Sequence, residues 1–466
     1  MVSSQTIPGN EIIHHPHSFA DPDGRVFLWE GELYRGIFPV AAPFFRQLAE
    51  NGILTNLVER GLLVNTELTP LTSSEFSLVF RHQVVPFASY PQEWCPLMLK
   101  DAALAIIDLA IELAHVGLLL KDGHPWNILF DACKPVYVDL GSITPTMRSW
   151  TWPAYPDFCR YCLYPLILMS QGYELMGRLL MCEEGGVREN ELFRLAPQLA
   201  FSAYIRWPLN LALSNAEKYW TRVTNGFLNR ESIVVPSEDH RSSRNQQKLL
   251  RFLTQVRRLV DRIPVPTFDF QKRAQDDSNV RAMNGDILSR LLRHLHPDSI
   301  LDVNSGNGSL AKQIANLGVR VVCFETDPGK VSHLYSDAKT KGLPILPLVM
   351  DFTRPTPARG VGSHWAIAAT ERFQCDLVLA FDLMNRPVPR SLGFETLING
   401  LGEFSKRWLV VEAPLDPAGD RLPIEGKQTN DFSMDRSIGI LKKQFRTVTR
   451  MDSQVNGRTL LVCEKF

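Results

Sequence analysis

The sequence has no net charge, no long apolar run and no repeated cysteine pair, and each absence excludes a class of protein. Lys plus Arg and Asp plus Glu number 50 each, so no overall field favours nucleic acid or an acidic membrane. The longest apolar runs, such as YCLYPLILM, fall well short of the roughly 20 residues that a membrane-spanning helix needs. No internal repeat or low-complexity tract is visible.

Cysteine usage argues against a zinc site. The eight cysteines are scattered, and only Cys159 and Cys162 form a C-x-x-C pair, with no second pair to complete a four-ligand motif. The stretch around them, FCRYCLYPLILM, is typical of a packed helix. The first residues lack the apolar core of a signal peptide. We therefore expect a cytoplasmic protein with reduced thiols.

The 466 residues suit two or three domains. In the first half, RVFLWEGELYRGI predicts a hairpin with its turn at Glu30–Glu32, and PLMLKDAALAIIDLAIELAHVG predicts a long helix closed by Gly117. The proline-punctuated IPVPTF marks the boundary between the halves. We expect a flexible leader (1–20), an α+β domain with a helical extension (21–262), a linker (263–280) and an α/β domain (281–466).

The second half alternates short apolar strands with helices. The strands are SILDV, RVVCFE, PILPLVM, CDLVLAF, RWLVVEA and TLLVCEKF. Strands that alternate with helices indicate a Rossmann-like, doubly wound parallel sheet.

A glycine-bearing turn follows the first of these strands. The strand Ile300–Val303 leads into Gly306 and Gly308, where backbone can approach a ligand closely. The second strand ends in Glu325, about 20 residues further on, where a carboxylate can accept hydrogen bonds from both ribose hydroxyls. The pattern predicts a nucleoside-binding site.

Two cofactor classes use such a turn. Dinucleotide enzymes need G-x-G-x-x-G, and the third glycine is absent. The spacing Asp302-x-Asn304-x-Gly306-x-Gly308 resembles D-x-G-x-G-x-G of class I S-adenosylmethionine-dependent methyltransferases. That resemblance implies that these four residues bind S-adenosyl-L-methionine, with the glycines beside its methionine part. It also implies Glu325 on the ribose and, from LVMDFT, Asp351 near the adenine amine.

Asn304 departs from this motif, because a glycine is usual there. Asn tolerates left-handed backbone, so the turn is still possible. The alternative is an α/β domain that kept its shape and lost its ligand. On the acceptor side we expect Asp382, Asn385 and Arg386 of AFDLMNRP, with Asp382 as the base, although a solvated strand end is the alternative.

A second motif, KDGHPWNILFDACKPVYVDLGS, spaces Asp122, Asn127 and Asp139 across a loop and a hairpin. Three oxygen-bearing side chains suit magnesium, although an ordinary polar turn is the alternative. The stretch resembles the D-x-H-P-x-N loop of aminoglycoside and choline phosphotransferases, which share the protein-kinase fold. The resemblance implies Asp122 as base for a hydroxyl acceptor, with Asn127 and Asp139 on Mg²⁺ that accompanies ATP.

The upstream half departs from the kinase pattern. A glycine-rich loop and a V-A-I-K lysine are both missing; Arg35 is the candidate substitute for the lysine and Glu50 its candidate partner. We therefore expect a degenerate protein-kinase-like domain. The stretches PVYVDLGSI, WPAYPDFCRYCLYPLILM, LVMDFTRPTPARG and ERFQCDLVLA resemble bacterial nodulation-type S-adenosylmethionine-dependent methyltransferases. The resemblance covers roughly residues 90–466 and is looser before them. Proteins of that group pair a kinase-like N-terminal region with a methyltransferase half.

Three hypotheses follow. The leading one is a methyltransferase that acts on a small-molecule or glycan acceptor, with a kinase-like domain that recognises the acceptor or a nucleotide. The second is a bifunctional kinase–methyltransferase that modifies a glycan or natural product. The third is a non-catalytic binding module. The sequence predicts no nucleic-acid partner, and it defines neither the acceptor nor the oligomeric state.

Overall fold

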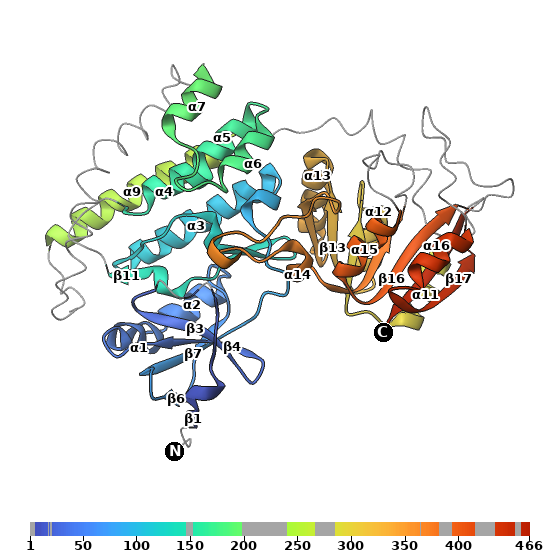
Figure 1. The fold of residues 1–466 in the computed structure, drawn as a ribbon. Coiled ribbons are helices and arrows are strands. Elements are labelled where there is room, and N and C mark those ends of the chain that lie inside the picture. The colour runs from blue at the N-terminus through green and yellow to red at the C-terminus, as the bar shows by residue number, and fades with distance from the viewer. Residues whose placement is uncertain are drawn as a thin grey trace.

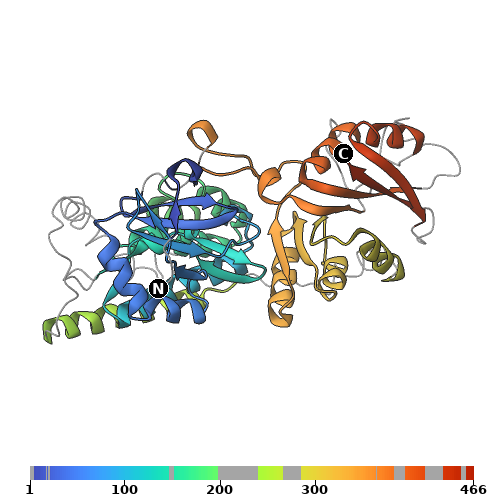
Figure 2. The ribbon, with the colours of Figure 1, turned by 90° about the horizontal axis from the view of Figure 1, so that it is seen from below.

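The computed structural model describes most of the chain as two bodies that lie side by side, each built on its own sheet (Figures 1 and 2). The N-terminal body carries the expected second motif, and the C-terminal body carries the glycine turn. The described residues are 5–16, 18, 21–145, 152–197, 240–265, 285–363, 365–381, 394–414, 434–452 and 458–466.

The N-terminal body begins with an antiparallel five-stranded sheet of order β2-β3-β4-β7-β5. The expected hairpin is confirmed, because β3 and β4 pair in register around Glu30 and Gly31. Both turn residues have positive φ, 49° and 80°, as a two-residue turn between twisted strands requires. The elements are β1 (Thr6–Ile7), η1 (Gly9–Glu11), β2 (Ile13–His14), β3 (Gly24–Trp29), β4 (Glu32–Ile37), α1 (Ala42–Glu50), α2 (Ile53–Glu59), β5 (Thr66–Leu68), β6 (Thr72–Ser73) and β7 (Leu78–His82).

The expected leader takes part in this body. β1 pairs with β6 and β2 pairs with β3. The described part of residues 1–20 therefore includes two short paired strands. Sequence reasoning missed them because two residues are too few to show an alternating pattern.

The predicted long helix is confirmed as α3 (Pro96–His115), with Gly117 in the left-handed region just after it at φ 75°. Many of its side chains are apolar and fully buried, and it packs against α9. The remaining elements of this body are η2 (Pro91–Glu93), β8 (Leu118–Leu120), η3 (Pro125–Asn127), β9 (Ile128–Asp131), β10 (Lys134–Tyr137), η4 (Leu140–Ser142), β11 (Ile143–Pro145), α4 (Tyr155–Phe158), η5 (Cys159–Leu163), α5 (Tyr164–Ser170), α6 (Glu174–Leu180), α7 (Glu189–Leu195) and α9 (His240–Arg262).

The C-x-x-C pair lies in a packed helical segment, as predicted. Cys159 and Cys162 fall on η5, a π-helical turn between α4 and α5, and both are buried free thiols. Burial raises the pKa of Cys159 to about 12 and raises that of Cys162 as well. Neutral buried thiols of this kind fill the core.

The C-terminal body is the expected doubly wound α/β sheet, of order β14-β13-β12-β15-β16-β18-β17. β12 through β16 are parallel. Its elements are α11 (Gly285–Leu295), β12 (Ser299–Val303), α12 (Ser309–Ala315), β13 (Arg320–Glu325), α13 (Pro328–Lys341), β14 (Ile345–Val349), η7 (Val361–Ser363), α14 (Ala369–Arg372), β15 (Cys375–Ala380), α15 (Phe394–Phe404), β16 (Ser405–Pro414), α16 (Met434–Leu441), β17 (Phe445–Asp452) and β18 (Arg458–Lys465).

Two features of this sheet differ from the prediction of uniformly parallel strands. β18 runs antiparallel to both β16 and β17, and β17 was not predicted. Only residues 453–457 connect β17 to β18, whereas a parallel crossover takes a dozen residues or more. β17 lies at the sheet edge, and its sequence FRTVTRMD is too polar to be recognised as an apolar strand.

A buried ion pair joins the two bodies. Arg372 of α14 and Glu93 of η2 are only 2% and 1% exposed, and Arg372 Nη2 lies 2.5 Å from Glu93 Oε1. The guanidinium also lies 3.8 Å from the ring centroid of Tyr90. Phe87 contacts Phe373 beside this pair, at 6.5 Å between centroids. This part of the interface therefore combines a buried charge pair with packed aromatic rings.

A second group of contacts surrounds α13. The hydroxyl of Tyr335 donates to Asp101 Oδ2 at 2.5 Å, and Lys339 Nζ lies 2.6 Å from the same oxygen. The ring of Tyr335 packs edge-on against Phe130. Buried residues of both bodies consequently form one continuous cluster. Most of the expected linker, from residue 266 onward, lies outside the described residues.

Within the described part of the chain, no helix combines the length and the apolar character needed to cross a membrane.

Candidate functional site

The glycine turn lies at the carboxyl end of β12, between β13 and β15. β13 and β14 extend the sheet on one side of β12, and the chain then crosses to β15 on the other side. In open α/β sheets, ligands bind outside the carboxyl ends of the strands at such a switch point. The predicted nucleoside site therefore lies where this fold class places its ligands.

Three residues of the turn have left-handed backbone, and one of them is not glycine. Asn304, Gly306 and Gly308 have φ values of 68°, 58° and 70°. Asn is among the few residues that adopt this region readily, so the turn forms with Asn304 in place of glycine. A Cβ on Gly308 would lie 2.4 Å from Leu334 Cδ1 of α13. Gly308 thus permits close helix packing.

Glu325 ties the turn to the end of β13. Its Oε2 accepts a hydrogen bond from the backbone N–H of Gly306 at 2.9 Å. Its Oε1 accepts from the N–H groups of Thr326 and Asp327 at 2.8 and 3.1 Å. The side chain is only 2% exposed. A carboxylate that accepts several backbone N–H bonds is strongly held, so Glu325 organises the turn, a role that the sequence did not indicate.

Asn304 and Asp302 are also buried at this edge. They are 8% and 3% exposed. Neither Oδ1 nor Nδ2 of Asn304 has a hydrogen-bond partner among the described residues. Buried amides are nearly always hydrogen-bonded, so this pair of orphaned polar atoms fits a site that a polar ligand completes.

Asp351 follows β14, one strand beyond Glu325. Its Oδ1 accepts from the N–H and hydroxyl of Thr353 at 3.0 and 2.7 Å, and its Oδ2 accepts from Arg354 Nε and Nη2 at 3.1 and 3.0 Å. Burial alone would raise the pKa of Asp351, but these hydrogen bonds outweigh it and lower the pKa. Polar residues thus gather at the carboxyl ends of three neighbouring strands: Asp302 and Asn304 at β12, Glu325 at β13 and Asp351 just after β14.

The predicted acceptor-side residues Asp382, Asn385 and Arg386 lie outside the described residues, which end at Phe381 and resume at Phe394.

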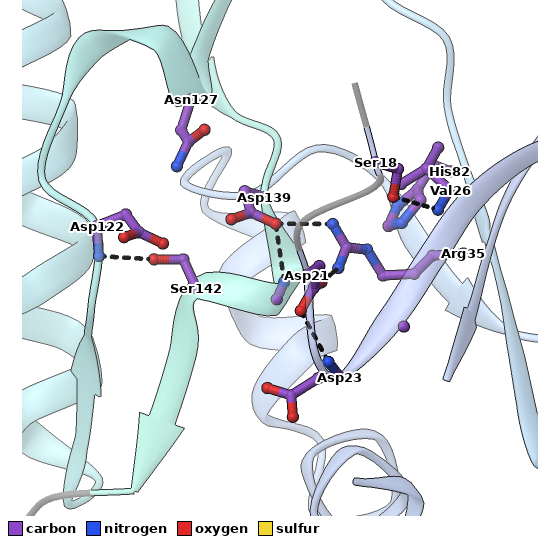
Figure 3. Close-up of polar contacts among 12 residues, drawn as sticks. Ser18, Asp21, Asp23, Val26, Arg35, His82, Asp122, Asn127, Asp139 and Ser142 are labelled. Atoms are coloured by element: carbon purple, nitrogen blue, oxygen red, sulfur yellow. Dashed lines mark hydrogen bonds and ion pairs between the residues drawn. The ribbon is translucent and has the colours of Figure 1, made fainter. Parts of the chain in front are cut away.

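In the N-terminal body, Asp122, Asn127 and Asp139 border one region (Figure 3). Asp122 follows β8, Asn127 ends η3, and Asp139 caps η4 by accepting from the Gly141 N–H at 3.1 Å. This arrangement is consistent with the prediction from sequence that the three side chains lie close together.

Arg35 of β4 enters this region and is ion-paired there. Its Nη2 donates to Asp139 Oδ1 at 2.7 Å, and its Nη1 donates to the carboxylate of Asp21. Its side chain is 6% exposed. The expected partner Glu50 is exposed on α1, so the expectation of an Arg35–Glu50 pair is wrong. Asp21 takes that place because it precedes β3 and lies beside β4 and η4.

Asn127 and Asp122 are joined through Tyr137. Asn127 Nδ2 donates to the Tyr137 hydroxyl at 3.0 Å, and that hydroxyl donates to the main-chain oxygen of Asp122 at 3.0 Å. The N–H of Asp122 donates to Ser142 Oγ at 3.0 Å. Burial, and then the nearby carboxylate of Asp139, raise the pKa of Asp122.

These contacts engage both residues that the resemblance assigned to Mg²⁺. The guanidinium of Arg35 is shared between Asp21 and Asp139, and the Asn127 amide nitrogen supports the loop through Tyr137. No group of three or more His, Cys, Asp and Glu side chains that could hold a metal ion occurs in the described ranges. Mg²⁺ in a nucleotide site is usually held by one or two carboxylates together with phosphate oxygens and waters, so the Arg35–Asp139 pair would have to open before Asp139 could bind the metal.

Arg35 provides a test of this arrangement. We expect Arg35→Met to lower the free energy of unfolding by about 1–3 kcal/mol, because it leaves Asp21 and Asp139 without their shared cation. Urea unfolding measures the effect. Arg81→Met is the matched control, since Arg81 of β7 pairs with Glu67 at the exposed surface and should change stability little. Stabilisation of the unsubstituted chain by Mg²⁺–ATP, lost in Asp139→Asn, would show instead that the Arg35–Asp139 pair opens to admit a metal and nucleotide.

Sequence reasoning missed Asp21, His82 and Tyr137. Asp21 lies outside the motif that drew attention to the region, whereas Tyr137 lies within it between Asn127 and Asp139. The contacts of both residues form only in the folded chain, so the motif alone did not assign them a role. Burial, and then the nearby Arg35, lower the pKa of His82 to about 3. Its imidazole is therefore neutral, with Nδ1 2.8 Å from the hydroxyl of Thr66.

Comparison with known proteins gives one full-length relative. Nodulation protein NoeA of Rhizobium meliloti (strain 1021) is 22% identical over 463 residues, which cover 96% of this chain and 95% of that protein. No family model matches the chain.

Two solved structures that are similar to this chain overlap with less than half of it. N-methyltransferase NodS from Bradyrhizobium japonicum WM9 is 16% identical, and the match covers 41% of this chain and 98% of that one, with a TM-score of 0.30. The 1,6-didemethyltoxoflavin-N1-methyltransferase of Burkholderia thailandensis, with bound 1,6-didemethyltoxoflavin and S-adenosylhomocysteine, is 14% identical. That match covers 42% and 83% of the two chains, with a TM-score of 0.32.

Proposed function

We propose that this chain is an S-adenosylmethionine-dependent methyltransferase whose cofactor binds at the carboxyl edge of the C-terminal sheet. The observation that carries the proposal is the hydrogen bond from Gly306 N to Glu325 Oε2, which brings the glycine turn and the acidic strand end together at the switch point. The orphaned amide of Asn304 supports the proposal, because a polar ligand would supply the hydrogen bonds that it lacks.

The chemistry then asks little of the protein. The cofactor, when bound, supplies a methyl group that is already activated. Glu325 and Asp351, one strand apart, are the proposed ribose and base contacts. Burial at the strand ends excludes water and fixes orientation. Asp382 is the proposed base that takes a proton from a hydroxyl or ammonium acceptor.

For the N-terminal body we propose a degenerate kinase-like domain that recognises a small-molecule or glycan acceptor. The loop from Asp122 to Asn127 after a long helix supports the kinase-like assignment. The Arg35–Asp139 ion pair favours a binding role over phosphoryl transfer, because it occupies the carboxylate that would hold the metal. The bifunctional alternative requires that this pair opens.

A thermal-shift panel tests the cofactor class. S-Adenosylhomocysteine, NAD⁺, ATP with Mg²⁺ and GTP with Mg²⁺ are compared on the full chain. NAD⁺ is included because Ala311 follows at the third position of a G-x-G-x-x-A spacing. We expect S-adenosylhomocysteine alone to stabilise the protein, by about 2.7 kcal/mol at 100 times its dissociation constant. A shift with NAD⁺ instead would identify a dinucleotide enzyme.

A further inference from the structure

We propose that the side-chain amide of Asn304 binds the amino-acid end of the nucleoside cofactor and thereby selects it over nucleosides that lack this group. The inference rests on the proposed function. It assigns a specificity-determining contact to the residue that departs from the glycine pattern of the turn.

Two properties of Asn304 are unfavourable for the fold alone. Its backbone is left-handed, at φ 68°, where glycine would be less strained. Its side chain is 8% exposed, yet neither amide atom has a partner among the described residues. Burial of an unpaired amide is costly. A glycine would avoid both costs, so a ligand that uses both amide atoms accounts for the residue.

The position of Asn304 indicates which part of the ligand it meets. Asn304 directly follows Val303, which pairs with Phe324 of β13 on one side and with Ala380 of β15 on the other. Glu325 therefore lies one strand away, and neighbouring strands are about 4.8 Å apart. A nucleoside whose ribose lies at Glu325 and whose base lies toward Asp351 must extend its 5′ substituent over the end of β12.

The chemistry of the amide matches that substituent. The amino-acid end carries a carboxylate and an ammonium group. Asn304 offers Nδ2 to donate to the carboxylate and Oδ1 to accept from the ammonium. A neutral amide repels neither charge, whereas an acid or a base at this position would repel one of them. Hydrogen bonds to charged groups are stronger than those between neutral groups.

The test compares two ligands on the full-length chain by calorimetric titration. S-Adenosylhomocysteine has the amino-acid end, and 5′-methylthioadenosine has the same nucleoside without it. We expect Asn304→Gly to weaken binding of S-adenosylhomocysteine roughly tenfold to a hundredfold, the scale of one or two hydrogen bonds to charged groups. Binding of 5′-methylthioadenosine should change less than about twofold. Because glycine accepts the left-handed backbone, this variant should fold at least as stably as the original chain.

Asn304→Asp is the matched second variant. It keeps the shape and tolerates left-handed backbone, but it replaces the donor with an acceptor that repels the ligand carboxylate. We expect Asn304→Asp to lower the affinity for S-adenosylhomocysteine more than Asn304→Gly does. The affinity for 5′-methylthioadenosine should again change little.

The outcomes separate the inference from the proposed function. Unchanged binding of S-adenosylhomocysteine by Asn304→Gly overturns the inference and leaves the proposed function standing. Equal losses for both ligands also overturn it, because the amide then acts on the nucleoside or on the turn. If the unsubstituted chain binds neither ligand, the proposed function fails first and the inference fails with it.

Discussion

Arg372→Ala is expected to lower the free energy of unfolding by about 3–5 kcal/mol, the usual cost of removing one partner from a buried ion pair. Glu93 would remain almost fully buried without its cation. The backbone oxygens of Ala88 and Ile367, which accept from Arg372 Nη1 and Nε, would lose their donors. Because these acceptors belong to different bodies, we expect the junction between the two to loosen. Urea unfolding of the full chain measures the change.

The double variant Glu93→Leu/Arg372→Met separates charge from packing. It removes both charges while keeping apolar volume, so it should cost much less than Arg372→Ala. Lys443→Ala is the surface control, since its pair with Glu395 is exposed and should contribute little. If Arg372→Ala lowers the free energy of unfolding no more than Lys443→Ala does, the two bodies are not joined through this pair.

Glu325→Ala is expected to weaken binding of S-adenosylhomocysteine by roughly a hundredfold or more, since two hydrogen bonds to a charged group are worth about that much. The substitution removes the proposed ribose acceptor, and it also releases the N–H of Gly306 from the turn. Stability should fall as well, by about 1–3 kcal/mol for each backbone donor left buried without a partner.

Asp376→Ala supplies the matched control for Glu325→Ala. Asp376 Oδ2 accepts from the backbone N–H groups of Asp298 and Ser299 at 3.0 Å each. Like Glu325, Asp376 therefore accepts hydrogen bonds from two or more backbone N–H groups. It does so at the opposite end of the sheet, where β12 and β15 begin. We expect Asp376→Ala to lower stability without changing the affinity of the folded protein for S-adenosylhomocysteine. Equal losses of binding in both variants would mean that Glu325 acts only through stability.

The parallel core of the C-terminal sheet was predictable from sequence because β12 through β15 are continuous apolar runs separated by helical segments. The turn at Asn304–Gly308 was predictable for a related reason, since left-handed positions accept few residue types. β17 was not predictable, because its few apolar residues are separated by polar ones in FRTVTRMD, as an edge strand allows. The direction of β18 follows from the short connection before it, and the apolar pattern does not encode that direction.

The partners of the site residues were the least predictable feature. Arg35 was expected to stand in for the missing lysine, but its contact with Asp21 depends on how the chain enters β3. Glu325 was expected to face a ligand, and its hydrogen bond to Gly306 became visible only when β12 and β13 were placed side by side. These contacts join residues that are far apart in the sequence and form only when the chain folds. The spacing of residues along the chain therefore does not predict them.

Calorimetric titration of the full-length chain with S-adenosylhomocysteine tests the cofactor site most directly. We expect saturable binding of one molecule per chain, weakened by Glu325→Ala and unchanged by Asp376→Ala. A flat titration with protein that unfolds cooperatively in urea would contradict the cofactor site and, with it, the proposed methyltransferase function.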